Sequence, residues 1–231
     1  MNYIIWNNKD SRDIKELIIS ELPPITKPNM RVKETVIDGV DGSLIEELGY
    51  ESYDKTVSIG LKVGADVDKV IEFFTGNGTV VFSNEPNKYY IARIIKGIDY
   101  TRLLRFRTAK VTFRVQPFKY SRVEAPREAS SDRTSMVVEN LGNHTSKPLI
   151  TIKGTGTVEL TVNDTVVCNY TFPSGENTVL LDSEKQDAYW DNVLKNRNMV
   201  GEFPVFEKGN NIIAWSGEVE SIKIEKYSRW L

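Results

Sequence analysis

TVSIGLKV, residues 56–63, is the stretch that decides the expected fold. Apolar and polar residues alternate through it, which is the period-two pattern of a β-strand with one buried face. The residues expected on that face are Val57, Ile59, Leu61 and Val63. The same alternation recurs in KVTFRV (110–115), VELTV (158–162) and SIKIEK (221–226). Since parallel strands buried on both faces read as continuous apolar runs, the alternation predicts antiparallel sheets and a mainly β fold.

The segment ADVDKVIEFFTGNG (65–78) interrupts this β pattern. Its apolar residues recur at positions i, i+3, i+4 and i+7, and they are Val67, Val70, Ile71 and Phe74. This spacing predicts one short amphipathic helix that packs against the core. Asp66 is the expected N-cap, and Gly76 or Gly78 the expected stop.

The polar stretch SRVEAPREASSDRTS (121–135) has almost no apolar content and reads as a linker. It predicts two domains, residues 1–128 and residues 129–231. Short strands separated by turn residues follow the linker, which indicates a β-sandwich. Before the linker, SRDIKELIISELPPI (11–25) fits either a helix or a strand, and its prolines favour the strand.

Near the C-terminus, FPVFEKGNNIIAWSG (203–217) places two apolar runs around a group of turn residues. Proline cannot donate a hydrogen bond to a central ladder, so Pro204 predicts that the first run is an edge strand. Gly209, Asn210 and Asn211 suit a turn, and the second run suits the return strand. The stretch is expected to form part of the sandwich, with a contact surface as the alternative.

The composition is that of an ordinary globular protein. The 231 residues are 40% hydrophobic and 27% charged, with a formal net charge of −2. No apolar run approaches the ~20 residues of a membrane-spanning helix, and the N-terminus lacks the pattern of a secretory signal peptide. We therefore expect synthesis in a cytoplasm and no membrane contact.

Basic residues gather between Arg93 and Arg133, where eleven Lys or Arg residues stand against four Asp or Glu residues. Most alternate with apolar residues, as on the solvated face of a sheet, so the pattern does not predict a nucleic-acid site. Cys168 is the one cysteine, which excludes an internal disulfide. We expect it to be a buried, inert thiol.

The sequence predicts no catalytic, cofactor-binding or metal site. His144 is the one histidine, so no His-paired metal site exists, and no GxSxG motif supports a serine nucleophile. GTGT (154–157) lacks the rest of a phosphate-binding loop and reads as a turn or bulge. DGVDG (38–42) resembles a calcium loop but has Val40 where an oxygen ligand is needed, and turns explain it better. Paired carboxylates are not recognisable from sequence, so a cell-wall glycosidase stays an open alternative.

Three aromatic residues of the second half could stack on sugars or contact a partner: Tyr189, Trp190 and Trp215. Packing in the core of the sandwich is the alternative, because aromatic rings dominate both settings. A carbohydrate-binding β-sandwich that recognises host cell-wall sugars is therefore a second interpretation of this chain.

The order of the motifs along the chain resembles the distal tail protein family of non-contractile, long-tailed bacteriophages and related prophages. The N-terminal part of this resemblance rests on YIIWNN (3–8), VIDGVDGSLIEELGYESYDKTVSIGL (36–61) and VVFSNEPNKYYIARI (80–94), with VTFRVQPFKYS (111–121) closing the domain. The C-terminal part rests on VVENLGNHTSKPLITIKGTG (137–156), LLDSEKQDAYWD (180–191) and GEFPVFEKGNNIIAWSGEVESIKIEKYSRWL (201–231). The resemblance covers nearly the whole chain.

The resemblance implies a structural protein of the tail tip, with no catalytic residues to carry over. It implies an N-terminal belt domain related to tail-tube proteins and a C-terminal galectin-like β-sandwich. Six copies would form a ring whose bore continues the tail tube, with DNA only in transit through it. The implied partners are the tail-tube protein, the tail-associated hub or lysin protein, and receptor-binding proteins. The implied location is the tail tip of the virion.

Two features depart from the family pattern. Asn7-Asn8 stands where the first turn often carries Asn-Gly, so a left-handed conformation is accessible at greater cost. The second domain has no room for an inserted carbohydrate-binding module or a long arm.

The hairpin region 36–53 is the expected site of subunit contacts. Its two Asp-Gly pairs favour turns, and its flanking apolar and aromatic residues suit a projecting arm. The residues expected at the oligomer interface are Val36, Ile37, Asp41, Ile45, Tyr50 and Tyr53.

Overall fold

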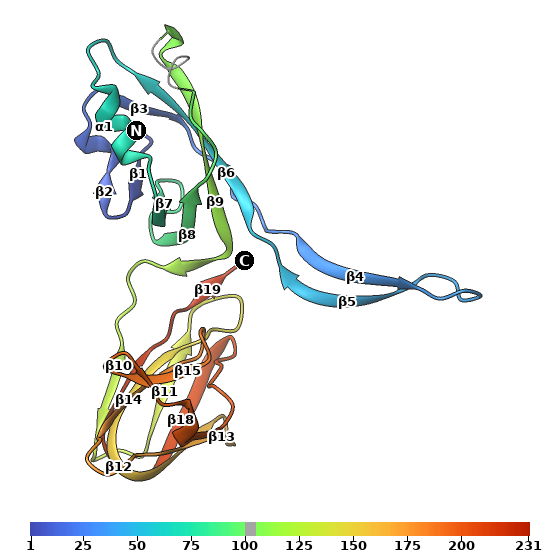
Figure 1. Cartoon of the computed structure of the whole chain (residues 1–231), viewed down its shortest axis with the longest axis vertical. Coiled ribbons are helices and arrows are strands. Elements are labelled where there is room, and N and C mark those ends of the chain that lie inside the picture. The colour runs from blue at the N-terminus through green and yellow to red at the C-terminus, as the bar shows by residue number, and fades with distance from the viewer. Residues whose placement is uncertain (100–104) are drawn as a thin grey trace. The chain divides into compact units, whose positions relative to one another are not determined.

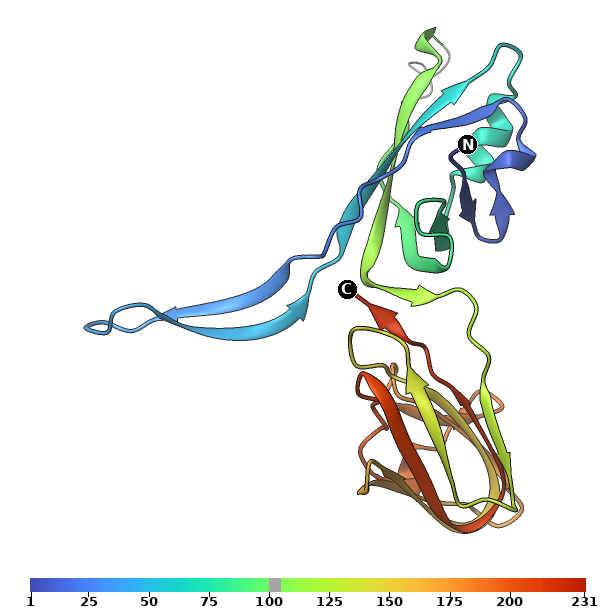
Figure 2. The same cartoon turned by 180° about the vertical axis from the view of Figure 1, so that it is seen from behind.

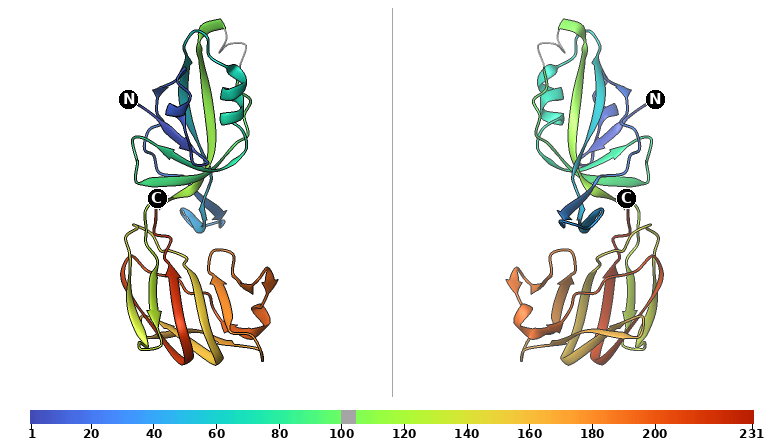
Figure 3. Two further views of the ribbon diagram at one scale, coloured as in Figure 1. Left: turned by 90° about the vertical axis from the view of Figure 1, so that its left-hand side faces the viewer. Right: turned by 90° about the vertical axis from the view of Figure 1, so that its right-hand side faces the viewer.

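The computed structural model of the chain describes residues 1–99 and 105–231 (Figures 1 and 2). By its internal contacts the chain divides into two compact units. Unit 1 comprises residues 1–122 and Leu231, and unit 2 comprises residues 123–230. Arg102, in the basic stretch noted above, lies outside the described residues. Both units are built mainly of strands (Figure 3), so the mainly β prediction is confirmed.

Unit 1 contains one sheet with the order β2-β1-β7-β8-β9-β6-β3, and the strand pairs along it are antiparallel, as the alternation predicted. Its strands are β1 (Ile4–Trp6), β2 (Lys9–Asp10), β3 (Leu17–Glu21), β6 (Tyr53–Leu61), β7 (Asn77–Phe82), β8 (Lys88–Ile94) and β9 (Thr108–Ser121). A short 3-10 helix, Ser11–Asp13, lies between β2 and β3. The strand favoured for segment 11–25 is therefore confirmed as β3. Strands β4 (Met30–Val36) and β5 (Ser43–Tyr50) pair only with each other within the described part of the chain.

The core of unit 1 uses the faces that the alternation predicted. Val57 and Ile59 are fully buried and Leu61 is 5% exposed, and the apolar residues of 110–115 are buried opposite them. Val63 is an exception, because β6 ends at Leu61 and Val63 is 86% exposed. The aromatic rings of Trp6 and Phe113 meet edge to face in this core, with centroids 5.3 Å apart.

The predicted helix is present as α1 (Val67–Phe73). The Asp66 side chain caps it by accepting hydrogen bonds from the backbone N–H groups of Asp68 and Lys69. Val70 and Phe74 are buried in the core of unit 1, as the helical spacing predicted.

Unit 2 is a β-sandwich whose strands are also antiparallel. Its sheet contains β10 (Arg127–Ser130), β11 (Ser135–Asn140), β12 (Leu149–Val162), β13 (Thr165–Thr171), β14 (Thr178–Asp182), β15 (Asp187–Trp190), β16 (Val193–Leu194), β17 (Met199–Gly201) and β18 (Gly209–Glu225). The short strand β19 (Arg229–Trp230) is not part of this sheet. A 3-10 helix, Asn196–Asn198, precedes β17. The core contains the predicted faces of 158–162 and 221–226, together with Cys168, which is 1% exposed. The expectation of a buried thiol is confirmed.

Strands β12 and β18 run beside each other through both layers of the sandwich (Figure 1). One half of β12 pairs with β14 and the other half with β13, while β18 pairs with β10 and β11 on its other side. The register of β12 with β18 shifts around Gly154 and again before Glu159. GTGT (154–157) is therefore a bulge between strands, as predicted.

The interpretation of 121–135 as a linker is wrong for part of that stretch. Residues 127–130 form β10, which pairs with the C-terminal half of β18 and buries Ala129. The Glu124 carboxylate accepts hydrogen bonds from the N–H and hydroxyl groups of Ser228 and lies 3.2 Å from the Lys226 ammonium. These partners lie about a hundred residues away in sequence, so local composition gave no sign of them.

The edge strand predicted at the start of 203–217 is wrong as well. Phe206 makes only an isolated bridge to Ser146, and β18 begins at Gly209. Gly209, Asn210 and Asn211, which were expected to form the turn, belong to β18 instead. Asn211 is fully buried, and its side chain accepts a hydrogen bond from the N–H group of Glu207 and donates one to the C=O group of Glu207, so it fixes the bend just before the strand. The return strand is confirmed as β18, which lies inside the sheet.

A candidate partner-binding arm and an exposed aromatic tip

Strands β4 and β5 form a two-stranded ribbon, called the arm here (residues 30–50), which extends away from the sheet of unit 1 (Figures 1 and 2). The two Asp-Gly turn signals lie in its end loop, where Gly39 and Gly42 have φ values of +82° and +87°. Only glycine adopts these angles without strain, so the turns are confirmed. Every residue of β4 is exposed, and so is all of β5 except its two ends.

The register of the arm places several exposed apolar side chains on one face, together with Glu34 and Glu47, while the exposed Leu44 lies on the other face. Val36 pairs with Ser43 and Glu34 pairs with Ile45, so Val36 and Ile45 share a face with Val32 and Met30, because alternate residues of a strand point the same way. Val36 is 71% exposed and Ile45 is 65% exposed. A two-stranded ribbon is at best marginally stable alone in water, and apolar residues in such numbers are typical of a surface that meets a partner.

The structure separates the predicted interface residues into two groups. Val36, Ile37, Asp41 and Ile45 lie on the exposed part of the arm. The two tyrosines lie instead at its base.

At that base, Tyr50 is half-buried against Phe118 of β9, with ring centroids 6.0 Å apart. The Tyr53 hydroxyl lies 3.4 Å from the Thr26 carbonyl, and burial raises the pKa of Tyr53 to about 12. Sequence reasoning did not distinguish the two groups, because the boundary between arm and sheet depends on contacts with β9.

A buried charged cluster lies beside the base of the arm, and the sequence analysis missed it. We call Lys55, Glu85, Tyr90 and Lys119 the root cluster. Lys55 is 2% exposed because it lies in phase with the core residues Val57 and Ile59 of β6 and faces the same side of the sheet. The Glu85 carboxylate accepts hydrogen bonds from Lys119 Nζ at 2.6 Å and from the Tyr90 hydroxyl. These bonds outweigh burial and hold the pKa of Glu85 below its usual value.

The three aromatic candidates of unit 2 occupy different environments. Trp215 lies in the hydrophobic core and is 5% exposed, so its ring face is not available to stack on a sugar. Trp190 is 42% exposed at the end of β15, next to the exposed residues Val193 and Leu194 of β16. Tyr189 is half-buried, and the Lys185 ammonium lies 5.5 Å from its ring centroid. A sugar or partner contact thus stays a prediction for Tyr189 and Trp190 alone.

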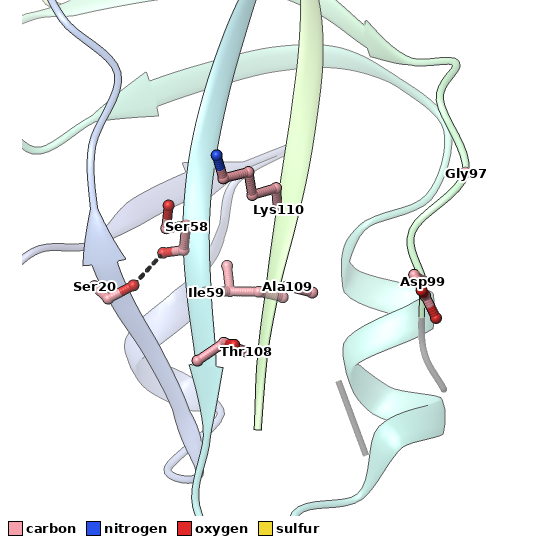
Figure 4. Close-up of a pocket in the computed structure, with 8 residues that line it drawn as sticks. All are labelled: Ser20, Ser58, Ile59, Gly97, Asp99, Thr108, Ala109 and Lys110. Carbon is pink, nitrogen blue, oxygen red and sulfur yellow. Dashed lines mark hydrogen bonds between the residues drawn. The ribbon is translucent and has the colours of Figure 1, made fainter. Parts of the chain in front are cut away.

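A hollow of about 490 Å³ opens on the sheet of unit 1. Figure 4 shows its lining, in which the Ser20 hydroxyl donates a hydrogen bond to the Ser58 carbonyl and Lys110 and Asp99 supply the charges. The described lining contains no histidine or cysteine. Across the described residues, no group of three His, Cys, Asp or Glu side chains is placed to hold a metal ion, and no helix is long and apolar enough to span a membrane.

The mainly β fold of this chain is that of a Dit-like phage tail hub protein. The solved structure that carries this conclusion is that of the Dit protein of phage SPP1, described as a paradigm of the hub adsorption apparatus of phages that infect Gram-positive bacteria. Its TM-score is 0.72 at 16% sequence identity, and the alignment covers 98% of this chain and 99% of that one. The fold implied by the resemblance is therefore confirmed over the whole chain.

Two chains of the phage p2 baseplate in its activated conformation also align over nearly their whole length. The chain from the strontium form has a TM-score of 0.47 at 10% identity and covers 97% of both chains, and that from the calcium form has 0.46 at 9% and covers 98% of both. TM-scores this low add nothing to the assignment of the fold. The sequence matches no protein-family model, and no curated protein is significantly similar to it.

Proposed function

We propose that this chain is a structural, non-catalytic subunit of a phage tail hub. In this proposal six copies form a ring at the distal end of the tail tube, and the ring joins the tube to the apparatus that adsorbs to the host. The observation that carries the proposal is the extent of the shared fold. Two units and the segments between them follow one known hub protein from end to end, with no large region of either chain left over.

The proposed partners follow the role of a hub. Tail-tube protein would contact one side of the ring and the tail-associated hub or lysin protein the other, with receptor-binding proteins outside and DNA in transit through the bore. Unit 1 would be the ring-forming belt, and unit 2 a galectin-like sandwich. The location would be the tip of the virion tail, after synthesis in the cytoplasm of the bacterial host.

We assign the contacts between neighbouring copies to the arm. A ring needs a heterologous interface that closes, in which one surface of each copy meets a different surface of the next. The apolar face of the arm, with Met30, Val32, Val36 and Ile45, supplies a surface that gains by being covered. Its unpaired strand edges supply further backbone groups for pairing.

The molar mass of the purified chain tests the proposal. We expect a species of about 160 kDa, six times the 26.3 kDa of the chain, and ring-shaped particles in electron micrographs. The measurement is light scattering across a concentration series, repeated after co-expression with the neighbouring hub protein. A monomer at every concentration in both preparations would contradict the proposed ring.

A carbohydrate-binding sandwich is the second candidate, and the exposed ring of Trp190 is the observation that favours it. Aromatic faces bind the apolar faces of sugars by stacking, and Lys185 beside Tyr189 could add polar contacts. The test is binding of purified cell-wall glycans to the full chain. Binding that is lost in Trp190→Ala but kept in Val166→Ala, a control for an exposed apolar residue elsewhere on unit 2, would support this candidate.

A further inference from the structure

The segment that leads from β3 into the arm, residues 22–29, is called the arm root here. It contains Pro23, Pro24 and Pro28. Proline has no backbone N–H group, so three of the eight residues of this segment cannot donate a backbone hydrogen bond to a neighbouring strand. It must be held mainly through its carbonyl groups, by donors that come from other elements.

Three side chains of unit 1 supply such donors to consecutive parts of the arm root. The donors belong to Lys55 of the root cluster and to two residues outside it, Tyr53 in β6 and Asn84 in the turn after β7. The bonds run from Asn84 Nδ2 to the Pro23 carbonyl at 3.0 Å, from Lys55 Nζ to the Pro24 carbonyl at 2.8 Å, and from the Tyr53 hydroxyl to the Thr26 carbonyl at 3.4 Å. The central bond comes from a charged group and is the strongest of the three by type.

The groups around the Lys55 ammonium indicate that its charge acts on the arm root. Its ammonium lies 5.0 Å from the ring centroid of Tyr90, 5.5 Å from that of Tyr53 and 5.9 Å from that of Phe82. The charged groups that face it are Glu85, which attracts it, and Lys119, which repels it. The root cluster holds two cations, Lys55 and Lys119, and one anion, Glu85. Since Glu85 is already paired with Lys119, one positive charge of the cluster is left over. The Pro24 carbonyl and the ring faces accommodate the remaining positive charge.

We propose that the Lys55 ammonium fixes the direction in which the arm leaves the sheet by holding the Pro24 carbonyl inside the root cluster. The proposal rests on the proposed function in one respect, since it names how the surface assigned to subunit contacts is held in place before a partner binds. A preset arm binds with a smaller loss of conformational freedom than a swinging one.

A purely stabilising role does not explain this residue. Burial lowers the pKa of Lys55 to about 8, which means that the site disfavours the charge that Lys55 carries there. An apolar side chain of similar length would fill the same space without that penalty. What the ammonium adds and methionine lacks is a directed bond to the arm root.

The proposal is tested by measuring the distance between arm and sheet in the full chain. Spin labels are attached at Thr35→Cys on β4 and at Lys110→Cys on β9, and the distance distribution is measured by pulsed electron spin resonance. Cys168 is buried with a pKa raised to about 12, so the introduced cysteines react selectively. We expect a single narrow distribution, and at least a twofold increase of its width in Lys55→Met.

Lys62→Met is the matched control, because Lys62 is exposed just beyond the end of β6. It should leave the width unchanged. Lys55→Gln serves as a second variant, since it is polar but too short to reach the Pro24 carbonyl, and it should broaden the distribution as Lys55→Met does. A distribution as narrow in both variants as in the parent would overturn the proposal. So would loss of the folded sheet in both, because Lys55 would then be needed for the sheet and not for the direction of the arm.

The outcome of this experiment does not depend on whether the chain assembles into a ring. The widths are measured on the single chain at low concentration, and the masses of assemblies are measured separately. A ring that forms from subunits with a broad parental distribution would overturn this inference and leave the proposed function intact. A narrow parental distribution that broadens in Lys55→Met would support the inference even where no ring forms.

Discussion

Lys55 introduces a positive charge into a site from which water is almost excluded, and this has a measurable effect on stability. Its pKa is lowered from 10.5 to about 8, chiefly by burial, with repulsion from Lys119 adding to the shift and attraction to Glu85 opposing it. Between these two pH values the unfolded chain binds more protons than the folded chain, so the free energy of unfolding rises with pH. The penalty is fully present below about pH 8 and disappears by about pH 10.5.

We therefore predict that Lys55→Met gains stability over the parent at neutral pH, by up to about 3 kcal/mol, and that the gain vanishes near pH 10.5. The measurement is urea unfolding of both proteins at several pH values, followed by circular dichroism. Groups that do not interact with Lys55 are common to both proteins and cancel in the difference. A difference that does not change with pH would contradict the prediction.

Glycine at position 217 is required by a close approach and not only by its backbone angle. Its φ is +96°, and a Cβ atom there would lie 2.3 Å from the Thr157 carbonyl oxygen of β12. Gly156 also has a positive φ, +67°, but nothing lies within 4 Å of the position of its Cβ. The two positions therefore separate the steric effect from the cost of a left-handed angle.

We predict that Gly217→Ala destabilises the chain by roughly 3 kcal/mol and Gly156→Ala by about 1 kcal/mol. Thermal unfolding monitored by calorimetry measures both. Equal losses in the two variants would mean that β12 and β18 separate locally without difficulty, and would refute the role given to the close approach.

At the scale of the elements, the arm is the part of the chain whose purpose depends most on a partner. A lysine at positions 36 and 45 would place two charges on its apolar face, and a charge in a contact from which water is excluded is costly. We predict that Val36→Lys with Ile45→Lys weakens ring assembly by at least about 2 kcal/mol per contact, roughly thirtyfold in affinity. The folded subunit should keep its unfolding temperature, because both side chains are exposed.

Light scattering of this double variant checks the prediction. Val63→Lys is the control, since Val63 is equally apolar and 86% exposed but lies outside the arm. Assembly of the double variant at the strength of the control would exclude the apolar face of the arm from the interface. Tyr50 is left unchanged in this test, because its contact with Phe118 at the base would confuse assembly with local folding.

The elements also show what the sequence could and could not predict. Strand β6 and helix α1 were predictable because each carries its own period of apolar residues and α1 has its cap next to it. Strand β10 was not, since it has one buried residue, Ala129, and owes its conformation to pairing with β18 far along the chain. The period-two pattern of a strand can be recognised in a sequence only where several alternate residues are buried.

The candidate site shows the same difference between features with a local sequence signal and features that depend on distant segments. The projecting hairpin was predictable from two Asp-Gly pairs, because turn chemistry is local. The contacts of Lys55 were not, because its position in phase with Val57 indicates that it faces inward but not that it meets Glu85 and the Pro24 carbonyl, which come from other segments. The sequence favoured a core position for Trp215 but left sugar stacking open, and the pairing of its strand within the sandwich decided for the core.

On the scale of the whole molecule, β12 and β18 determine how unit 2 responds to proteases. Because the two strands belong to both layers, opening one layer removes the frame on which the other is built. Partial opening of unit 2 then costs as much free energy as its complete unfolding, so a protease encounters unit 2 either fully folded or fully unfolded. Digestion should therefore yield unit 2 as one resistant fragment, without shorter intermediates.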